Sequence, residues 1–202
     1  DYVIPIYVRH KYDGTITNNI AYPLTRTLYG LRTRQPIAGD FGFSGRLARA
    51  YLTEKTWNDN VSEFGIDIWM TTTAIVRGFQ VCQSFMGAPK SHKAKDPAAH
   101  LGPMFYQVVG TAFSLAIDFE FIWKDTSRSL PTSIFGFGLG IREEPPAVQV
   151  STEKLLDAFQ NGRREFSDLW EKVIAPLNLE DLLHISDVLI DRVEFPADLW
   201  AR

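Results

Sequence analysis

A change of segment type partway along the chain limits the possible folds more than any other feature of the sequence. Up to about residue 86, segments rich in Val, Ile and Tyr alternate with helical patterns, and after about residue 103 helical patterns dominate. Segments 2–8 and 79–86 predict strands, because β-branched and aromatic residues favour extended backbone. The alternation predicts a mixed α/β fold followed by a mostly helical region.

The other segments are predicted from apolar periodicity and from helix start and stop residues. The expected helices are residues 18–28, with Thr15 or Thr17 as cap, a break at Pro23 and an end at Gly30; 46–52; 67–77, ended by Gly78; 104–123; 152–173, capped by Ser151 or Thr152; and 179–190. Segments 35–44, 87–103 and 124–150 predict loops. We therefore expect two domains, 1–103 and 104–202.

Composition excludes several classes of protein. The net charge of −3 argues against a broad nucleic-acid surface. A single cysteine, Cys82, excludes an internal disulfide framework and is expected to be a small buried side chain. No apolar run reaches the roughly 18–20 residues of a membrane span, and the first residues do not resemble a secretory signal. These features predict a cytoplasmic protein, and the apolar residues at both ends suggest a piece of a longer one.

Three short motifs follow one another between Gln35 and His92. They are Gln-Pro-Ile-Ala-Gly-Asp at 35–40, Phe-Gly-Ile-Asp-Ile-Trp at 64–69, and Gly-Ala-Pro-Lys-Ser-His at 87–92. Together they supply a glycine-containing loop, a carboxylate at a helix start and a histidine in a basic loop. This combination suits a site for a phosphate-bearing, metal-bound substrate.

Each motif also has an ordinary structural interpretation. Asp67 is either a helix cap or dipole partner, or a carboxylate presented to a substrate hydroxyl. The lysines around His92 are either a solvated loop or a site for a diphosphate, with the imidazole as a metal ligand. Segment 35–45 is either a plain connection or a loop whose backbone approaches a ligand, and its glycine spacing fits neither a Rossmann fingerprint nor a P-loop.

Aromatic residues make up 13% of the chain, including five Trp and fourteen Phe. Most of these rings are expected in the core, because rings bury large apolar areas. Phe64 and Trp69 flank Asp67, and exposed rings at that place would favour a sugar site.

The three motifs in this order resemble the second half of the mannosylglycerate, glucosylglycerate and glucosyl-3-phosphoglycerate synthases. These are retaining glycosyltransferases of the GT-A fold that use nucleotide-diphosphate sugars. The matching segments are Tyr7–His10, Thr15–Thr17, Gln35–Asp40 (the family's Gln-Pro-Leu-Gly-Gly-Glu loop), Trp57–Asp67 (its Trp-Gly-Ile-Asp stretch) and Gly87–His92 (its Gly-Lys-x-His loop). Residues 1–110 carry the resemblance, and residues 111–202 match only as a helical region.

The resemblance implies roles for individual residues. His92 would be a ligand of a divalent cation, Mg²⁺ or Mn²⁺, beside the aspartates of an Asp-x-Asp motif, and Asp67 would hold the acceptor hydroxyl. Substrate-binding positions would be Arg9 and Thr15 for the acceptor's anionic group, and Ile37, Ala38 and Gly39 near the transferred sugar. Lys90 or Lys93 could assist at the departing diphosphate.

The chain departs from the family's pattern at three points. Ala38 replaces a glycine and Asp40 replaces a glutamate. No Asp-x-Asp motif occurs in the sequence. We therefore expect the nucleotide-binding half to precede this segment in a longer enzyme, and the chain alone to be a poor catalyst.

Three functions are consistent with these features. The first is retaining transfer of a hexose from a UDP- or GDP-linked donor to a small anionic acceptor such as glycerate or phosphoglycerate. The second is inverting transfer with Asp67 as general base. The third is a non-catalytic helical interaction module, a possible homodimer, with the apolar residues Trp170, Leu177, Leu182, Leu189 and Trp200 facing a partner.

Overall fold

The computed structural model describes residues 1–10, 12–90, 97–136, 143–186 and 195–201. Its contacts form two compact units, Asp1–Val148 and Gln149–Arg202. The first unit extends beyond the boundary expected at residue 103, because helix α4 (Pro97–Asp118) packs against helix α3 (Ile66–Val76). The functional division into an acceptor-side part, 1–103, and a helical region, 104–202, stays a prediction.

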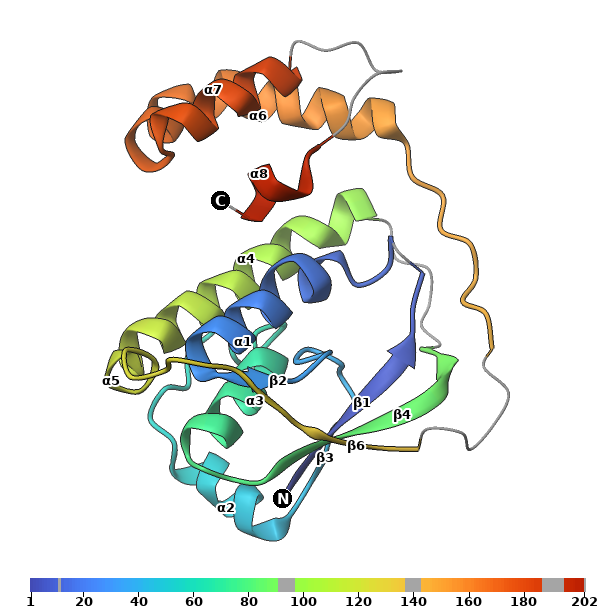
Figure 1. The fold of residues 1–202 in the computed structure, drawn as a ribbon, viewed down its shortest axis with the longest axis vertical. Coiled ribbons are helices and arrows are strands. Elements are labelled where there is room, and N and C mark those ends of the chain that lie inside the picture. Colours follow the sequence, from blue (N-terminus) through green and yellow to red (C-terminus); the bar gives the residue numbers. More distant parts are fainter. Residues whose placement is uncertain (11, 91–96, 137–142, 187–194, 202) are drawn as a thin grey trace. The chain divides into compact units, whose positions relative to one another are not determined.

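The first unit is built on a small, mainly parallel sheet (Figure 1). Its strands, in spatial order, are β3 (Gly42–Phe43), β1 (Tyr2–Val8), β4 (Val81–Pro89) and β6 (Ser133–Phe135). Strand β4 runs parallel to both β1 and β6, while β3 is antiparallel to β1. A separate parallel pair joins β2 (Leu31–Arg32) to β5 (Leu130–Pro131).

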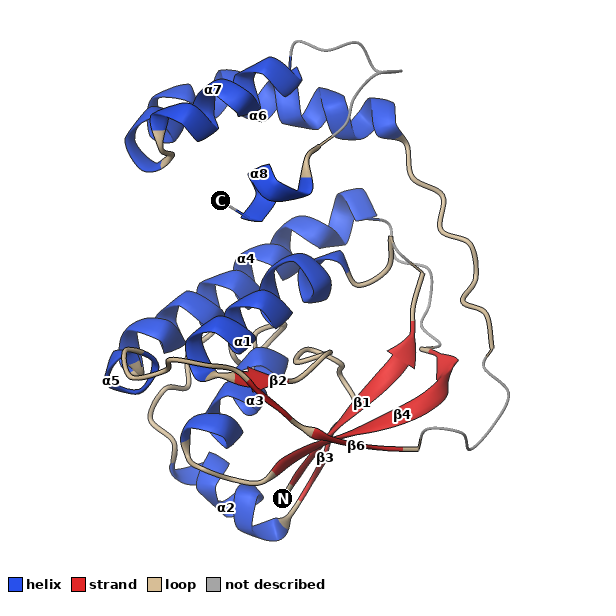
Figure 2. Ribbon diagram, in the orientation of Figure 1, coloured by secondary structure: helices blue, strands red, loops and turns tan. Residues whose placement is uncertain are grey.

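The helices, in chain order, are the π-helix η1 (Thr17–Ala21), α1 (Tyr22–Tyr29), α2 (Gly45–Thr53), α3 (Ile66–Val76), α4 (Pro97–Asp118), α5 (Glu120–Trp123), α6 (Thr152–Val173), α7 (Pro176–Ser186) and α8 (Ala197–Ala201). Figure 2 shows strands and helices together in the first unit, and in the described residues after α5 the strands are the short β5 and β6, followed by helices α6, α7 and α8. The mixed α/β class expected from the sequence is confirmed.

Several local predictions are confirmed by the backbone. Gly30 and Gly78 follow α1 and α3 with φ of 65° and 71°, a left-handed conformation that favours glycine. The Ser151 hydroxyl accepts from the Lys154 N–H and caps α6. At Pro23 the chain passes from a π-helix into an α-helix, which matches the expected restart.

Other local predictions are wrong. Neither Thr15 nor Thr17 caps a helix, since Thr17 is buried within η1 and the residue before η1 makes no side-chain cap. Helix α4 begins at Pro97 instead of 104, and the loops expected at 35–44 and 124–150 contain the short strands β3, β5 and β6. Strands this short carry too few side chains to show a periodicity.

The core of the first unit lies between the sheet and helices α1, α3 and α4, which lie side by side (Figure 1). One buried cluster joins Tyr2, Ile4, Ala38, Leu47 and Ala74, a second joins Ile16, Ala21, Ile68, Val108 and Ala112, and a third joins Val61, Trp69, Leu115 and Phe119. Helix α3 contributes to all three clusters. Its position is therefore fixed by packing on several sides.

In the second unit, helices α6 and α7 pack together. The rings of Phe159 and Trp170 lie 5.7 Å apart on α6, and Phe166 interrupts the helical backbone between them. Among the described helices of the chain, none is long and apolar enough to cross a membrane.

Candidate functional site

Polar residues from all three sequence motifs meet at the carboxyl ends of β1 and β4. Tyr7 lies one residue before the end of β1, and Lys90 directly follows β4. Val8 pairs with Pro89, so the two strands end at the same edge of the sheet. The carboxyl edge of parallel strands is where open α/β sheets commonly bind ligands.

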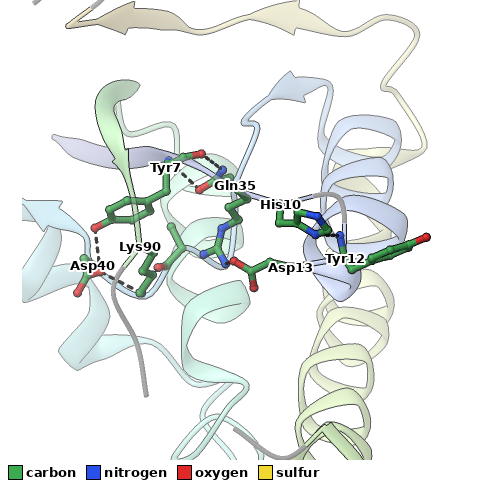
Figure 3. A network of polar contacts seen from close by, with 9 residues as sticks. Tyr7, His10, Tyr12, Asp13, Gln35, Asp40 and Lys90 are labelled. Carbon is green, nitrogen blue, oxygen red and sulfur yellow. Dashed lines mark hydrogen bonds and ion pairs between the residues drawn. The ribbon is translucent and has the colours of Figure 1, made fainter. Parts of the chain in front are cut away.

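A buried amide ties the loop 35–40 to this edge. The Gln35 side chain accepts from the Tyr7 N–H (3.1 Å) and donates to the Tyr7 carbonyl (2.9 Å). The amide thus makes both hydrogen bonds that a neighbouring strand would make at this position. Figure 3 shows the two contacts side by side.

A second buried glutamine holds the start of the same loop. Gln83, on β4, accepts from the Arg34 N–H at 2.5 Å and donates to the Arg32 carbonyl at 3.1 Å. Further along the loop, the Thr71 hydroxyl of α3 donates to the Pro36 carbonyl (2.7 Å), and Ala38 is buried in the core. The loop therefore has a fixed backbone, although it has little regular structure.

Lys90 lies across this loop, where its ammonium group has three partners. It donates to the Ala38 carbonyl and forms an ion pair with Asp40 Oδ2 at 2.9 Å. It also lies 5.6 Å from the centre of the Tyr7 ring. The Tyr7 hydroxyl donates to the same Asp40 oxygen (2.9 Å), so Tyr7, Asp40 and Lys90 form one cluster (Figure 3).

Gly39 is the residue that makes this close approach possible. Its φ of 86° is left-handed, and a Cβ there would overlap the Lys90 ammonium. The same Cβ would lie 3.7 Å from Asp67 Oδ2. Gly39 therefore brings the ammonium and the second carboxylate to the same short piece of backbone.

Asp67 does not cap α3, because the cap position is Gly65 and makes no side-chain bond. It lies in the first turn of the helix, with its carboxylate beside the Gly39 backbone. Burial raises the pKa of Asp67 to about 6, with Asp40 adding to the rise, while Lys90 and the Gly39 N–H oppose it. A carboxylate with this pKa changes protonation near neutral pH, as a general base does.

Asp40 has the opposite electrostatics, although it lies close by. Hydrogen bonds from Lys90 and Tyr7 lower the pKa of Asp40, so it stays ionised in neutral solution. Two nearby carboxyl groups with pKa values moved in opposite directions are a common feature of acid–base sites.

Of the residues predicted for the acceptor, Arg9 is near this cluster. Its guanidinium pairs with Asp13 at 3.1 Å, and its charge helps to lower the pKa of Asp40. Thr15 is exposed at the start of the helical segment before η1. Ile37 is half-buried and packs against the second core cluster.

The aromatic residues beside Asp67 do not form a sugar platform together. Trp69 is only 1% exposed, and its indole N–H donates to the Thr56 hydroxyl (2.8 Å), so it belongs to the core. Phe64 is partly exposed. The expectation of a flanking ring is wrong for Trp69, because the residue faces inward on α3. Cys82, expected to be buried, is half-buried on β4.

The predicted metal ligand, His92, lies outside the described residues. Among the residues that the structure describes, no group of three His, Cys, Asp or Glu side chains could hold a metal ion. Asp40 and Asp67 approach each other, but the Lys90 ammonium is close to both. The described residues alone do not form a site suited to a divalent cation, and the metal stays a prediction.

A hollow of about 450 Å³ lies away from this cluster, at the other end of α3. Its lining includes Glu54, Arg77, Asp118 and Phe119. We place the candidate site at the carboxyl edge of the sheet instead, because Asp40 and Asp67, whose pKa values are shifted in opposite directions, lie there.

Sequence reasoning missed the two glutamine tethers and the contact of Tyr7 with Asp40. Gln83 gives a signal in hindsight, since a glutamine within the apolar strand Val81–Phe85 needs buried partners. A scan against protein-family models matches none to this chain, and no curated protein matches it.

Proposed function

We propose that the chain is the acceptor-side part of a glycosyltransferase that moves a hexose from a nucleotide-diphosphate sugar to a small anionic acceptor such as glycerate or phosphoglycerate. The supporting observation is the meeting of loop 35–40, Asp67 and Lys90 at one edge of the sheet. These residues come from the three motifs on which the resemblance to the mannosylglycerate and glucosylglycerate synthases rests. A GT-A fold, completed by a nucleotide-binding half, is part of the proposal.

Asp67 is the residue assigned to the acceptor hydroxyl. Its carboxylate lies between the helix start and the glycine of the loop, and burial raises its pKa to about 6. In the retaining reaction it accepts a hydrogen bond from the attacking hydroxyl and orients it. The acceptor oxygen then forms the new bond to the anomeric carbon as the bond to the diphosphate breaks, and the hydroxyl proton passes to the departing diphosphate oxygen on the same face.

The diphosphate gains negative charge as this bond breaks, and a positioned cation stabilises that charge. Among the described residues of the three motifs, Lys90 supplies a cation, and the Ala38 carbonyl and Asp40 hold its ammonium group in place. A divalent cation held by His92 and by aspartates of the nucleotide-binding half would supply further charge at the same place. Arg9 and Thr15 keep the acceptor roles implied by the resemblance.

The test is a transfer assay with the product of the complete reading frame. The intact mass of the native protein establishes its length, and UDP- and GDP-hexoses are then offered with glycerate or 3-phosphoglycerate and Mg²⁺ or Mn²⁺. A hexosyl product detected by mass spectrometry supports the proposal. A full-length product of only 22.9 kDa without any transfer would remove it.

The raised pKa of Asp67 favours one alternative reaction, inverting transfer. A base with a pKa of about 6 can take the hydroxyl proton at neutral pH, while the hydroxyl attacks from the face opposite the leaving group. The anomeric proton coupling of the product, measured by NMR, separates the two reactions. Retained configuration supports an orienting role of Asp67, and inverted configuration supports a base.

A further inference from the structure

Both cations described at the site are already paired with a carboxylate of the chain. Lys90 pairs with Asp40 at 2.9 Å, and Arg9 pairs with Asp13 at 3.1 Å. An anionic ligand that uses either cation therefore competes with a carboxylate of the chain for the same charge. The two pairs differ in how easily this replacement can happen.

The Lys90 pair opens to solvent on the carboxylate side. The Asp40 side chain is 62% exposed, whereas that of Lys90 is 22% exposed. An exposed pair of this kind contributes little to stability, because water solvates a released carboxylate well. In the Arg9–Asp13 pair both side chains are largely buried, with 13% and 26% exposed, and the aliphatic part of Arg9 lies against Gly14.

Lys90 keeps its position when Asp40 turns away. Its ammonium also donates to the carbonyl of Ala38, a residue buried in the core within the loop tied by Gln35 and Gln83. Removing Asp40 therefore exposes a cation that is already placed, beside the Gly39 backbone. Little rearrangement is needed for a ligand to take over the charge.

We infer that Lys90 is a binding site for a phosphate group of the ligand, and that the Asp40 carboxylate occupies this site until the phosphate displaces it. Asp40 is attached to the same loop and competes at high local concentration. A ligand carboxylate carries no more charge than Asp40 and gains little by the exchange. A phosphate carries up to two negative charges and three acceptor oxygens, so it can displace Asp40 from Lys90.

The inference rests on the proposed function only in taking the ligand to carry phosphate. Two sources of phosphate fit the chemistry, the diphosphate of a sugar donor and the phosphate of a phosphorylated acceptor. Binding can be measured without any transfer, so its failure and the failure of the proposed function are separate results.

The experiment is calorimetric titration of the 202-residue chain, in the presence of a chelator, with inorganic pyrophosphate, 3-phosphoglycerate and glycerate. We expect phosphate-bearing probes to bind and glycerate to bind more weakly. Lys90→Met is expected to weaken phosphate binding about tenfold or more, the loss of a charge-assisted bond. Asp40→Asn is expected to tighten it about two- to fivefold, because the competitor is weakened.

Two controls separate displacement from general electrostatics. Asp13→Asn removes the same charge from the neighbouring ion pair and is expected to change affinity less than Asp40→Asn. In the Lys90→Met background, Asp40→Asn is expected to have a much smaller effect, because the contact between Asp40 and Lys90 is then absent. Far-ultraviolet circular dichroism and thermal unfolding show whether each variant is folded.

Comparing the probes shows whether the phosphate group belongs to the sugar donor or to the acceptor. Dependence on Lys90 with pyrophosphate alone assigns the site to the donor, dependence with 3-phosphoglycerate alone assigns it to the acceptor, and dependence with both assigns it to phosphate in general. The inference is overturned if Asp40→Asn leaves phosphate binding unchanged or weaker, or if no phosphate probe binds either protein. Because Asp40 is exposed, this variant decides the question even if Lys90→Met does not fold.

Discussion

A carboxylate lies close to a cation at each end of helix α3, but the two arrangements differ in almost every other respect. Just after the last residue of α3, Arg77 forms two hydrogen bonds of 2.9 Å with Glu54, whose side chain is 6% exposed. At the first turn, Asp67 has no ion pair of this kind among the described residues. Lys90 instead contacts the exposed Asp40 at 2.9 Å, and the Tyr7 hydroxyl donates to the same oxygen. A fork of two bonds to a buried carboxylate fixes geometry, whereas a single contact to an exposed one can exchange.

Under the proposed function, the first pair is structural and the second belongs to the site. Arg77, the residue after α3, also complements the carboxyl end of the helix dipole, and its pair with Glu54 joins the end of α3 to the residue that follows α2. Asp67 lies at the amino end of α3, where the dipole favours a carboxylate, yet burial still raises its pKa to about 6. A charged group kept at such a cost to stability is typical of active sites.

The largest expected effect is that of Asp67→Asn, in opposite directions on activity and stability. Transfer by the complete enzyme is expected to fall about 100-fold or more. The free energy of unfolding is expected to rise by up to about 3 kcal/mol at about pH 8, because the buried charge is removed.

The pH dependence of this gain has a definite sign. The folded pKa of Asp67 lies above its ordinary value, so its protonated form stabilises the fold at low pH and this contribution is lost as pH rises through about 6. The advantage of Asp67→Asn should therefore vanish near about pH 4. Urea unfolding at both pH values checks this, and an equal gain at both would contradict the assignment of a buried carboxylate.

At the other end of α3, Glu54→Gln is expected to lower the free energy of unfolding by about 1.5–3 kcal/mol and to leave transfer unchanged. Arg77 lowers the pKa of Glu54, so this stability is present at neutral pH and is lost as pH falls through the folded pKa. The deficit of the variant should shrink in acid. A loss of transfer equal to that of Asp67→Asn would break the distinction between the two ends.

Two glycines, Gly39 beside the first turn of α3 and Gly78 after its last turn, allow a matched comparison of the two ends of the helix. Gly39 and Gly78 both have positive φ, 86° and 71°, but only Gly39 has an ammonium where a Cβ would lie, and Gly78 has no atom within 4 Å. Alanine strains the backbone at both places by about 1–2 kcal/mol. Gly39→Ala is expected to cost about 1 kcal/mol more, because Lys90 must leave the Ala38 carbonyl. Equal unfolding free energies would mean that this contact contributes nothing.

The smallest expected effect on stability is that of Asp40→Asn, less than about 1 kcal/mol in denaturant unfolding. The change is chemically the same as Glu54→Gln, so the ratio of the two losses measures how much burial and the second hydrogen bond contribute. A loss as large as that of Glu54→Gln would mean that Asp40 is a structural partner of Lys90 and not a replaceable one.

The sequence predicted the elements that carry long patterns and marked ends. Strand β1, helix α3 with its stop at Gly78, and helix α6 with its Ser151 cap all have such local signals. The start of α4 was missed by seven residues, since Pro97 and its neighbours have no apolar periodicity. The short strands β3, β5 and β6 exist only through their partners elsewhere in the chain.

The sequence predicted which residues belong to the candidate site, but not which of them contact one another. Order along the chain brought Asp67, Gly39 and Lys90 into one hypothesis, and the structure describes them close together. The pairing of Lys90 with Asp40 depends on the parallel registration of β1 and β4, which nothing local encodes. The inward direction of Trp69 likewise depends on what covers α3.

The glutamine tethers of the loop have one further consequence, which concerns dissolved salt. Ionic screening acts over about 8 Å at physiological ionic strength and weakens exposed ion pairs, while hydrogen bonds of buried neutral amides are little affected. Gln35 and Gln83 are such amides, and the Lys90–Asp40 pair is open to ions. Rising ionic strength should therefore loosen the charges of the site and leave its backbone in place, so that the chain could operate across changing salinity with one unaltered geometry.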